Sequence, residues 1–425
     1  GTPGLQGAAS PLRGVRRELR LPISRRGSHP ASCRRRRGSG TRRCCPRCRR
    51  YRPAGQPITR AAPTTPGIAY PCPAHPGRQG APTVKVGIIN VTGYAGCELV
   101  RILRHHPEVE IASVTGRSAA GQSLGEVFPH LDNMDLDITA DLCADLDLVF
   151  SALPHKASAE ACIPLLEQGV KVVDISADFR LKQADVYREW YGVDHPDPTY
   201  LEEAVYGLTE LNRDAVADAR LVANPGCYPS SAILALAPAI QNGLIGSDII
   251  VDSKSGVSGA GRTLSMTTHF SEVNENVMAY SVNGHRHLPE ISQELDSIAG
   301  DPVNLTFLTH LIPMTRGILS SCYAPLRSDL AQDPDASERV RRVYQEFYAD
   351  DAFVRVTDAP PQTKQTLGNN YCLVHPVVDS RTNRLIVISC LDNLVKGAAG
   401  QAVQNMNLMC GFPEEMSLEA LAVYP

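Results

Sequence analysis

One cysteine among thirteen occupies a position that suits a nucleophile. Cys227 follows a short apolar, strand-like run at residues 221–223 and precedes a helix-like run at residues 232–240. Unpaired N–H groups and the positive end of the dipole at a helix start favour a thiolate, and Pro229 suits the first helical turn. We therefore predict that Cys227 is a thiolate-prone nucleophile. The alternative is an inert cysteine that only packs.

A second reactive group lies between residues 283 and 290, where His285, Arg286, His287 and Glu290 occur within six positions. Histidine exchanges protons near neutral pH, and a nearby carboxylate can orient its ring. The segment is therefore predicted to supply an acid/base. Purely structural histidines are the alternative, and a metal site at His285 and His287 lacks further ligands at suitable spacing.

Glycines between residues 87 and 96 indicate a dinucleotide-binding loop. Gly93 and Gly96 supply two of the small residues that such a loop needs between a strand and a helix. Asn90 takes the first turn position, which asparagine tolerates because it adopts positive φ more readily than most residues. An ordinary glycine turn is the alternative.

The end of the second expected strand predicts which nucleotide binds. This segment carries Arg117 and Ser118 where an NAD-binding protein usually has a carboxylate for the ribose hydroxyl. A guanidinium and a hydroxyl favour a 2′-phosphate, so we expect NADPH/NADP as the cofactor. Arg117 as a solvated surface charge is the alternative.

The small residues at 255–261 leave backbone N–H groups available for an anion or for a nicotinamide ring. A flexible linker is the alternative interpretation. His310, inside an apolar run, is better explained as a structural histidine in a sheet.

Strand and helix patterns that alternate from residue 84 must position these groups. Such alternation predicts a parallel sheet covered on both faces, whereas longer, polar-interrupted strands after Cys227 predict a mixed sheet. The expected class is α/β, a Rossmann-type dinucleotide-binding domain plus an α+β catalytic domain with a mixed sheet. Expected strands lie at residues 84–89, 109–115, 146–151, 170–175, 220–223, 248–252, 304–312, 371–379 and 384–391, with helices at 95–106 and 393–409.

Composition divides the chain into an arginine-rich first segment and an acidic remainder. Residues 1–80 contain eighteen arginines and one acidic residue, and the remainder has 24 basic and 44 acidic residues. We predict that residues 1–80 are a disordered transit peptide; nucleic-acid binding by this arm is the alternative. The expected domains are then 81–226, completed by 392–425, for NADP and 227–391 for catalysis.

The composition of the remaining 345 residues argues against several classes of protein. No apolar run approaches the roughly 20 residues of a membrane span, and the acidic balance argues against nucleic-acid binding. Scattered cysteine spacings favour reduced thiols over disulfides.

Six blocks together resemble the N-acetyl-gamma-glutamyl-phosphate reductase family, a relative of aspartate-semialdehyde dehydrogenase. They resemble the plant-type members most, and the likeness runs from about residue 84 to the C-terminus. One segment departs from the pattern, because the loop usually reads Gly-Ala-Ser-Gly-Tyr and this chain has Asn-Val-Thr-Gly-Tyr at residues 90–94. The blocks are residues 151–155, 174–180, 224–229, 254–261, 284–290 and 392–402.

The resemblance implies a reaction through a Cys227 thioester. The thiolate would attack the acyl phosphate, phosphate would leave, and NADPH would reduce the thioester to N-acetyl-L-glutamate 5-semialdehyde. His285 is expected to manage the proton, with His287 as its competitor and Glu290 as orienter. Backbone donors, aided by Asn224, would stabilise the oxyanion.

The motifs above predict binding residues, and the resemblance adds Asn393 and the 255–261 loop at the nicotinamide. Arg180, Tyr280 and Arg286 are expected to contact the substrate. The expected cofactor contacts are Thr92, Gly93, Tyr94, Gly96, Arg117, Ser118, Leu153, Pro154, Ser255, Gly256, Gly259 and Asn393.

Partners and location follow from composition and spacing together with the resemblance. We expect a small acyl-phosphate substrate, a homo-oligomer (dimer or tetramer), no metal, no nucleic acid and no membrane. The expected location is the plastid, with the mitochondrion as the alternative. An aspartate-semialdehyde dehydrogenase and a non-catalytic NADP-binding sensor of the same fold remain as alternative functions.

Overall fold

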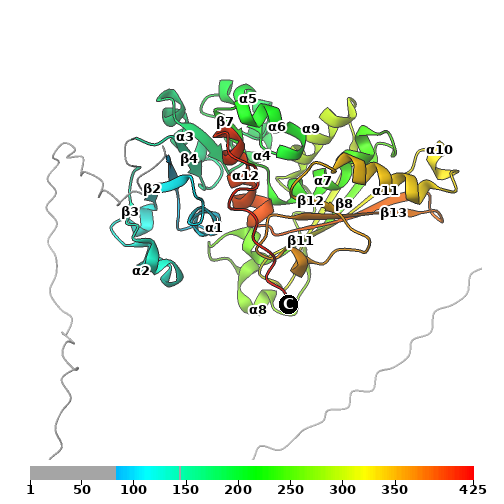
Figure 1. Ribbon diagram of the computed structural model, residues 1–425. Coiled ribbons are helices and arrows are strands. Elements are labelled where there is room, and N and C mark those ends of the chain that lie inside the picture. Colours follow the sequence, from blue (N-terminus) through cyan, green and yellow to red (C-terminus); the bar gives the residue numbers. More distant parts are fainter. Residues whose placement is uncertain (1–82, 143–144) are drawn as a thin grey trace, which may run out of the picture. The chain divides into compact units, whose positions relative to one another are not determined.

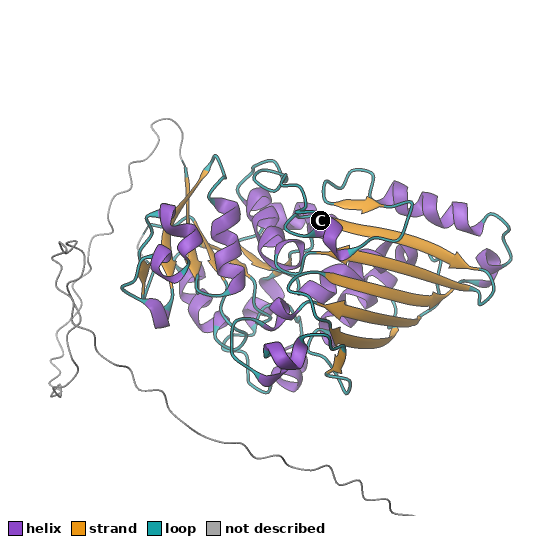
Figure 2. Cartoon of the chain, turned by 90° about the horizontal axis from the view of Figure 1, so that it is seen from below, coloured by secondary structure: helices purple, strands orange, loops and turns teal. Residues whose placement is uncertain are grey.

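A computed structural model describes residues 83–142 and 145–425. The prediction for residues 1–80 lies outside this range. The described chain contains two seven-stranded sheets, whose elements are labelled in Figure 1. Figure 2 shows the long strands of the second sheet side by side. Among the described residues, no helix has the length and apolar character needed to cross a membrane.

The first sheet has the order β3-β2-β1-β4-β5-β7-β6, and all its pairs are parallel. This order starts 3-2-1-4-5, as in a doubly wound dinucleotide-binding sheet. Its strands are β1 Val84–Ile89, β2 Val109–Thr115, β3 Ile138–Thr139, β4 Leu148–Ser151, β5 Lys171–Asp174, β6 Val205–Tyr206 and β7 Leu221–Ala223.

The central strands of this sheet are buried because both faces are covered. All four residues of β4 are buried, and the core packed around the sheet draws side chains from both ends of the described chain. The associated helices are α1 Tyr94–Leu103, η1 Arg117–Ala119, α2 Leu124–Val127, η2 Pro129–Met134, α3 Ser158–Glu167, α4 Ala184–Tyr191, α5 Thr199–Glu203 and α6 Thr209–Asp218.

The second sheet is mixed, in the order β12-β13-β14-β11-β8-β10-β9. β8 pairs parallel with β10 and antiparallel with β11, and β14 pairs antiparallel with both β11 and β13. Its strands are β8 Asp248–Ser255, β9 Met278–Tyr280, β10 Asn304–Leu311, β11 Ile318–Pro325, β12 Val354–Val356, β13 Cys372–Asp379 and β14 Arg384–Leu391.

Burial alternates along these strands because only one face of the sheet is packed against helices. In β11 the buried residues are Ile318, Ser320, Cys322 and Ala324, and their neighbours are half-buried. The helices of this part are α7 Cys227–Gln241, η3 Val257–Ala260, η4 Met266–Thr268, α8 Phe270–Val273, α9 Leu288–Ala299, α10 Ser328–Ala331, α11 Ala336–Phe347 and η5 Thr363–Thr366.

The last strand leads into a π-helical turn, η6 Val395–Ala399, and then into α12 Gly400–Met409. Side chains of α12 belong to the core of the first sheet. The observed architecture confirms the predicted α/β class with one parallel and one mixed sheet. The single helix expected at residues 393–409 instead begins as a π turn.

Candidate active site

Cys227 is the first residue of α7, directly after the N-cap residue Gly226. The strand β7 ends at Ala223, so three residues turn the chain from the sheet into the helix. Cys227 lines a cavity of about 500 Å³. Most of the remaining lining residues come from the segments after β4 and β5, from the end of β8 and the loop after it, from β9 and from the turn before α9, and α4, α7 and β10 add one residue each. They include Leu153, Pro154, His155, Ser176, Arg180, Tyr191, Tyr228, Ser255, Gly259, Tyr280, His285, Arg286 and His287.

The thiol of Cys227 is less acidic than its helix position predicts. Burial raises its pKa to about 11, which outweighs the lowering effects of the Arg180 guanidinium and of backbone N–H groups at the helix start. The expectation of a thiolate-prone Cys227 is therefore wrong for the protein without substrate. The effect of burial is the largest because the thiolate loses its hydration. The backbone N–H groups and the Arg180 guanidinium offset only part of this loss.

Both predicted histidines lie at the cavity, and they differ in their surroundings. The Nδ1 atom of His285 accepts a hydrogen bond from the backbone N–H of His287 at 3.1 Å. His287 lies against the nucleophile turn, because a Cβ added to Gly226 would be 2.6 Å from its Nε2 atom. Burial lowers the pKa of His285 to about 4, aided by Arg286, and burial also lowers the pKa of His287 well below its usual value. Both rings are therefore neutral at pH 7.

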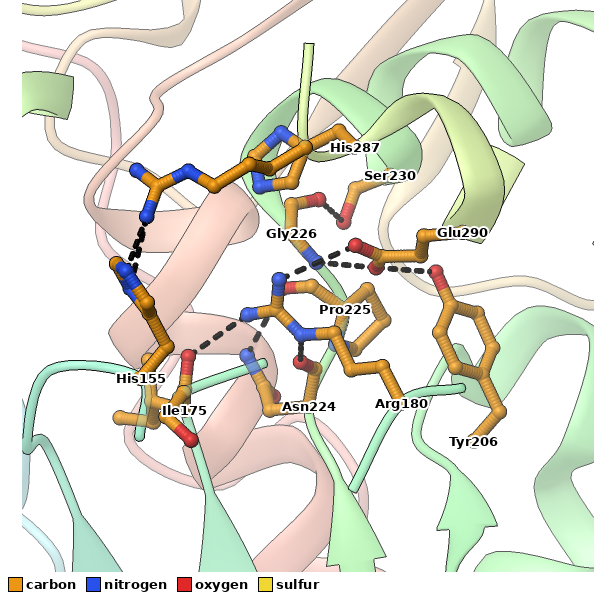
Figure 3. Close-up of polar contacts among 12 residues, drawn as sticks. His155, Ile175, Arg180, Tyr206, Asn224, Pro225, Gly226, Ser230, His287 and Glu290 are labelled. Carbon is orange, nitrogen blue, oxygen red and sulfur yellow. Dashed lines mark hydrogen bonds and ion pairs between the residues drawn. The ribbon is translucent and has the colours of Figure 1, made fainter. Parts of the chain in front are cut away.

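Glu290 orients the nucleophile turn and an arginine, and not a histidine as expected. Its carboxylate accepts hydrogen bonds from the Gly226 N–H at 2.7 Å, from the Tyr206 hydroxyl at 2.9 Å and from Arg180 Nη1 at 3.1 Å (Figure 3). Both members of the ion pair are buried. The histidine-orienting role expected of Glu290 is thus replaced by a link between α9 and Gly226.

The guanidinium of Arg180 is also held by two carbonyl oxygens. It donates from Nε to Asn224 at 2.8 Å and from Nη2 to Ile175 at 2.7 Å (Figure 3). With Glu290 on Nη1, all three nitrogens have protein partners. Arg180 lines the cavity, yet its geometry suits an internal cation beside Cys227 better than a free substrate ligand.

Asn224 does not line the cavity. Its amide nitrogen donates to the carbonyl of Ala398 at 3.1 Å, and its oxygen accepts from Asn405 at 3.0 Å. The side chain is fully buried. The side chain expected to help an oxyanion is therefore committed to α12 and to the π turn.

Arg286 and Tyr280, the other expected substrate contacts, lie at the cavity. Arg286 Nη1 contacts both ring nitrogens of His155, and the hydroxyl of Tyr280 is 2.9 Å from that of Tyr228. Burial and Arg286 lower the pKa of His155 to about 4. A neutral His155 can therefore accept from Arg286 and hold this cation at the cavity. Residues 151–155 already stood out in the sequence, although His155 was given no role there.

The glycine loop has the geometry that a dinucleotide needs. Asn90 has φ of 64° and donates to the Ala152 carbonyl at 2.8 Å. At Gly96 an added Cβ would lie 2.6 Å from the Asn90 carbonyl oxygen, so only glycine lets α1 approach this closely. No side chain caps α1 at Gly93, and its first turn has no acidic residue. These features fit a pyrophosphate at the helix start.

The other expected cofactor residues divide between the loop, the cavity and the protein interior. Tyr94, Arg117 and Ser118 are exposed, and the Thr92 carbonyl accepts from Arg262 at 2.6 Å, a contact that the sequence did not indicate. Asn393 is buried beneath the 255–261 loop.

Asn393 connects that loop to Gly317, before β11, through the two ends of its amide. It donates to the Ser258 hydroxyl at 2.9 Å and accepts from the Gly317 N–H at 2.7 Å. Gly256 packs so tightly that an added Cβ would lie 2.7 Å from the Thr315 carbonyl oxygen. Among the described residues, no cluster could hold a metal ion.

Comparisons with known proteins identify both parts of the chain. Residues 85–219 match the family model of the semialdehyde dehydrogenase NAD binding domain, and residues 227–393 match that of the semialdehyde dehydrogenase dimerisation domain.

Curated relatives extend the match to the whole length of known enzymes. The N-acetyl-gamma-glutamyl-phosphate reductase of Dehalococcoides mccartyi is 56% identical over 342 residues, covering 80% of this chain and 99% of the relative. That of Pelotomaculum thermopropionicum is 51% identical over 353 residues, with 80% and 99% covered.

Solved structures confirm the fold. Aspartate semialdehyde dehydrogenase II of Vibrio cholerae, complexed with ASA, matches with a TM-score of 0.60 at 18% identity and covers 78% of this chain and 99% of that one. The Candida albicans enzyme, solved with NADP, has a TM-score of 0.55 at 16% identity, with 77% and 98% covered. This likeness does not favour the alternative aspartate-semialdehyde activity.

The expected plastid or mitochondrial location is wrong. The curated relatives at 51% and 56% identity are enzymes of bacteria, which contain neither organelle. The resemblance to the plant-type enzyme led to that expectation, whereas the identities of 51% and 56% are to bacterial reductases. Given the identity of 56% over nearly the full length of a curated relative, the chain belongs to the N-acetyl-gamma-glutamyl-phosphate reductase family.

Proposed function

We propose that this chain reduces N-acetyl-gamma-glutamyl phosphate to N-acetyl-L-glutamate 5-semialdehyde with NADPH and releases phosphate, as a step of arginine biosynthesis. The observation that carries the proposal is the cavity at the start of α7, where Cys227 meets two neutral imidazoles and the cations Arg180 and Arg286. An acyl phosphate is an electrophile with a good leaving group, and its negative charge suits these cations.

In this proposal the Cys227 sulfur attacks the acyl carbon, and the thiol proton passes to the neutral imidazole of His287. The bond from carbon to phosphate oxygen breaks, which leaves a thioester. We assign the proton to His287 in place of His285 because its Nε2 atom lies against Gly226. An anionic substrate raises the pKa of a nearby imidazole and lets this transfer proceed from a ring of low intrinsic basicity.

NADPH, when bound, supplies the hydride that reduces the thioester carbon. Backbone N–H groups at the start of α7 stabilise the resulting oxyanion. As the carbon–sulfur bond breaks, the imidazolium of His287 returns its proton to the sulfur and the aldehyde leaves. Glu290 and Arg180 keep the turn at Gly226 in position during this cycle.

The cofactor site combines residues of both matched domains. We propose that the loop from Thr92 to Gly96 holds the pyrophosphate and that Arg117 and Ser118 bind the 2′-phosphate. The nicotinamide would lie near Leu153, Pro154 and the 255–261 loop, whose shape Asn393 maintains. The corresponding domains are residues 81–226 with 392–425 for the cofactor and 227–391 for catalysis.

A phosphate-dependent assay tests the reaction and the cofactor together. With N-acetylglutamate semialdehyde and phosphate, NADP should be reduced much faster than NAD, and aspartate semialdehyde should be a poor substrate. Faster turnover of aspartate semialdehyde would overturn the proposal. Cys227→Ser should abolish the reaction while NADPH binding, followed by fluorescence, remains; a non-catalytic sensor would bind NADPH but show no turnover in either form.

Arg117 provides a separate test of nucleotide choice. Its exposed guanidinium follows β2, where a 2′-phosphate would lie. Arg117→Ala should raise the KM for NADPH at least ~10-fold, as expected when a charge-assisted hydrogen bond is lost, and change the KM for NADH little. Equal effects on both nucleotides would return Arg117 to a surface charge.

We also propose that the protein assembles as a homodimer or homotetramer, supported by the match of residues 227–393 to a dimerisation domain. Sedimentation velocity on the active enzyme should give a mass of two or four chains. A single chain with full activity would contradict this proposal.

A further inference from the structure

A π-helical turn lies directly against the nucleophile. The turn η6, Val395–Ala399, brings Gly397 so close that an added Cβ would be 2.7 Å from the Cβ and 3.1 Å from the Cα of Cys227. π-Helical turns are rare and occur often at functional sites. Since only glycine fits this contact, the place of the turn limits where the Cys227 backbone can lie.

The turn is tethered on one side by a buried ion pair. Lys396 is fully buried, and its ammonium lies 2.5 Å from Glu210 Oε1 on α6 and 2.8 Å from Gln404 Oε1 on α12. Burial raises the pKa of Glu210, but the Lys396 ammonium more than offsets this and holds it below its usual value. Glu210 is therefore held as a carboxylate, and hydrogen bonds from Lys396 and Gln404 fix its orientation.

The next two residues complete the connection to the nucleophile. Gly397 contacts Cys227, and the Ala398 carbonyl accepts from Asn224 at 3.1 Å, in the turn that leads into α7. Three consecutive residues thus contact α6, the nucleophile and the turn before it. Neither Lys396 nor Glu210 lines the cavity.

We propose that Lys396 is a positioning residue, whose ion pair with Glu210 holds the π turn so that Gly397 supports Cys227 in its reactive place. The inference rests on the proposed role of Cys227 as the nucleophile. A buried ion pair can often be replaced without loss of stability. We therefore assign the Lys396–Glu210 pair a role in geometry: it fixes the position of the π turn η6 relative to Cys227, the first residue of α7.

Separating positioning from simple stability requires a paired substitution. Lys396→Met alone leaves Glu210 buried without its cation and should lower both the melting temperature and kcat. Lys396→Met with Glu210→Gln removes both charges and keeps polar groups for Gln404, so the melting temperature should recover. kcat and the rate of Cys227 alkylation by iodoacetamide should stay ~10- to 100-fold below wild type, the effect expected of a misplaced reacting group, with KM values unchanged.

Recovery of kcat and alkylation together with stability would overturn the inference, because the pair would then serve stability alone. Wild-type kcat in the folded single variant would overturn it as well. If neither variant folds, a substitution at Gly397 tests the contact between the π turn and Cys227.

Gly397→Ala tests the contact itself, with Gly125→Ala as the matched control. At Gly125, in α2, an added Cβ would lie equally close to its nearest neighbour, 2.7 Å from the Cα of Asp132. Gly397→Ala should lower kcat and Cys227 alkylation ~10-fold or more, whereas Gly125→Ala should affect stability only. Equal rates in the two variants would contradict the proposal.

The alkylation rate, read by peptide mass spectrometry, separates this inference from the proposed function. Retained turnover in Cys227→Ser would defeat the proposed function. Loss of turnover in Cys227→Ser, combined with unchanged alkylation in Gly397→Ala and in the paired variant, would defeat this inference alone.

Discussion

At the scale of single residues, Cys227 shows how burial can reverse a prediction from sequence. The first residue of a helix was expected to be a thiolate, yet burial raises the pKa of this thiol to about 11. The nucleophile is thus protonated in the free enzyme at neutral pH. Its activation therefore depends on a base and on the charge of the bound substrate.

The pH dependence of alkylation tests this state of Cys227. In the ligand-free protein, the thiolate fraction rises about tenfold per pH unit below the pKa. The rate of iodoacetamide modification should therefore still be rising between pH 6 and 9.5, whereas free cysteine, with a pKa of about 8.5, should already level off. A plateau below pH 8 would contradict a Cys227 thiol whose pKa is raised.

The two histidines should respond differently to removal. His287 lies against Gly226, whereas His285 lies among the rings of Tyr228, Tyr280 and Phe307. His287→Asn should lower kcat by about 10²- to 10⁴-fold, the usual contribution of a general base, and His285→Asn should lower it less. The reverse order, measured with saturating substrates, would restore His285 as the proton carrier.

At the scale of elements, the turn between β7 and α7 is held by a residue of α9. Glu290 accepts from the Gly226 N–H and pairs with Arg180, which in turn holds the carbonyls of Ile175 and Asn224. The loops after β5 and β7 and the helix α9 are thereby joined beside Cys227.

Breaking this pair should cost stability, because Arg180 and Glu290 are both buried. Arg180→Met should lower the free energy of unfolding by about 3–5 kcal/mol, since it leaves a buried carboxylate without its cation. Arg188→Met is the control, because its ion pairs are exposed and should contribute at most about 1 kcal/mol. Similar losses in chemical denaturation of the two variants would refute the structural role of Arg180.

Most elements were predictable because their side chains follow a simple period. The expected strands at residues 84–89, 109–115 and 384–391 coincide with β1, β2 and β14. The strand predictions omitted β11. Its buried face includes Ser320, and this polar residue interrupts the apolar pattern by which a strand is recognised. That hydroxyl is buried because it bonds to Ser231 and Ser253, which no local pattern reveals.

The sequence was sufficient to predict the reactive groups of the site, but not which side chains would contact one another there. Cys227, His285 and His287 stood out by residue type and local setting, and the structure brings all three to one cavity. Arg180, the ion-pair partner of Glu290, lies 110 residues away in sequence, so tertiary packing and no local pattern brings the two together. The π turn was likewise hidden, because its apolar and small residues also fit an α-helix.

At the scale of the whole molecule, the cavity draws on both sheets. The ends of β4 and β5 contribute His155 and Ser176, and the second sheet contributes Ser255 and Tyr280. Arg262 reaches from the loop after β8 to the Thr92 carbonyl and joins the glycine loop to this region. Cofactor and substrate would therefore meet at Cys227, where the proposed reaction forms a covalent thioester.

The most direct test mixes the enzyme with N-acetyl-gamma-glutamyl phosphate in the absence of NADPH and follows phosphate release and peptide mass. A burst of one phosphate per active site, with an acyl group on the peptide that contains Cys227 and no burst in Cys227→Ser, is the predicted result. Phosphate release that requires NADPH, with no adduct on Cys227, would contradict the account.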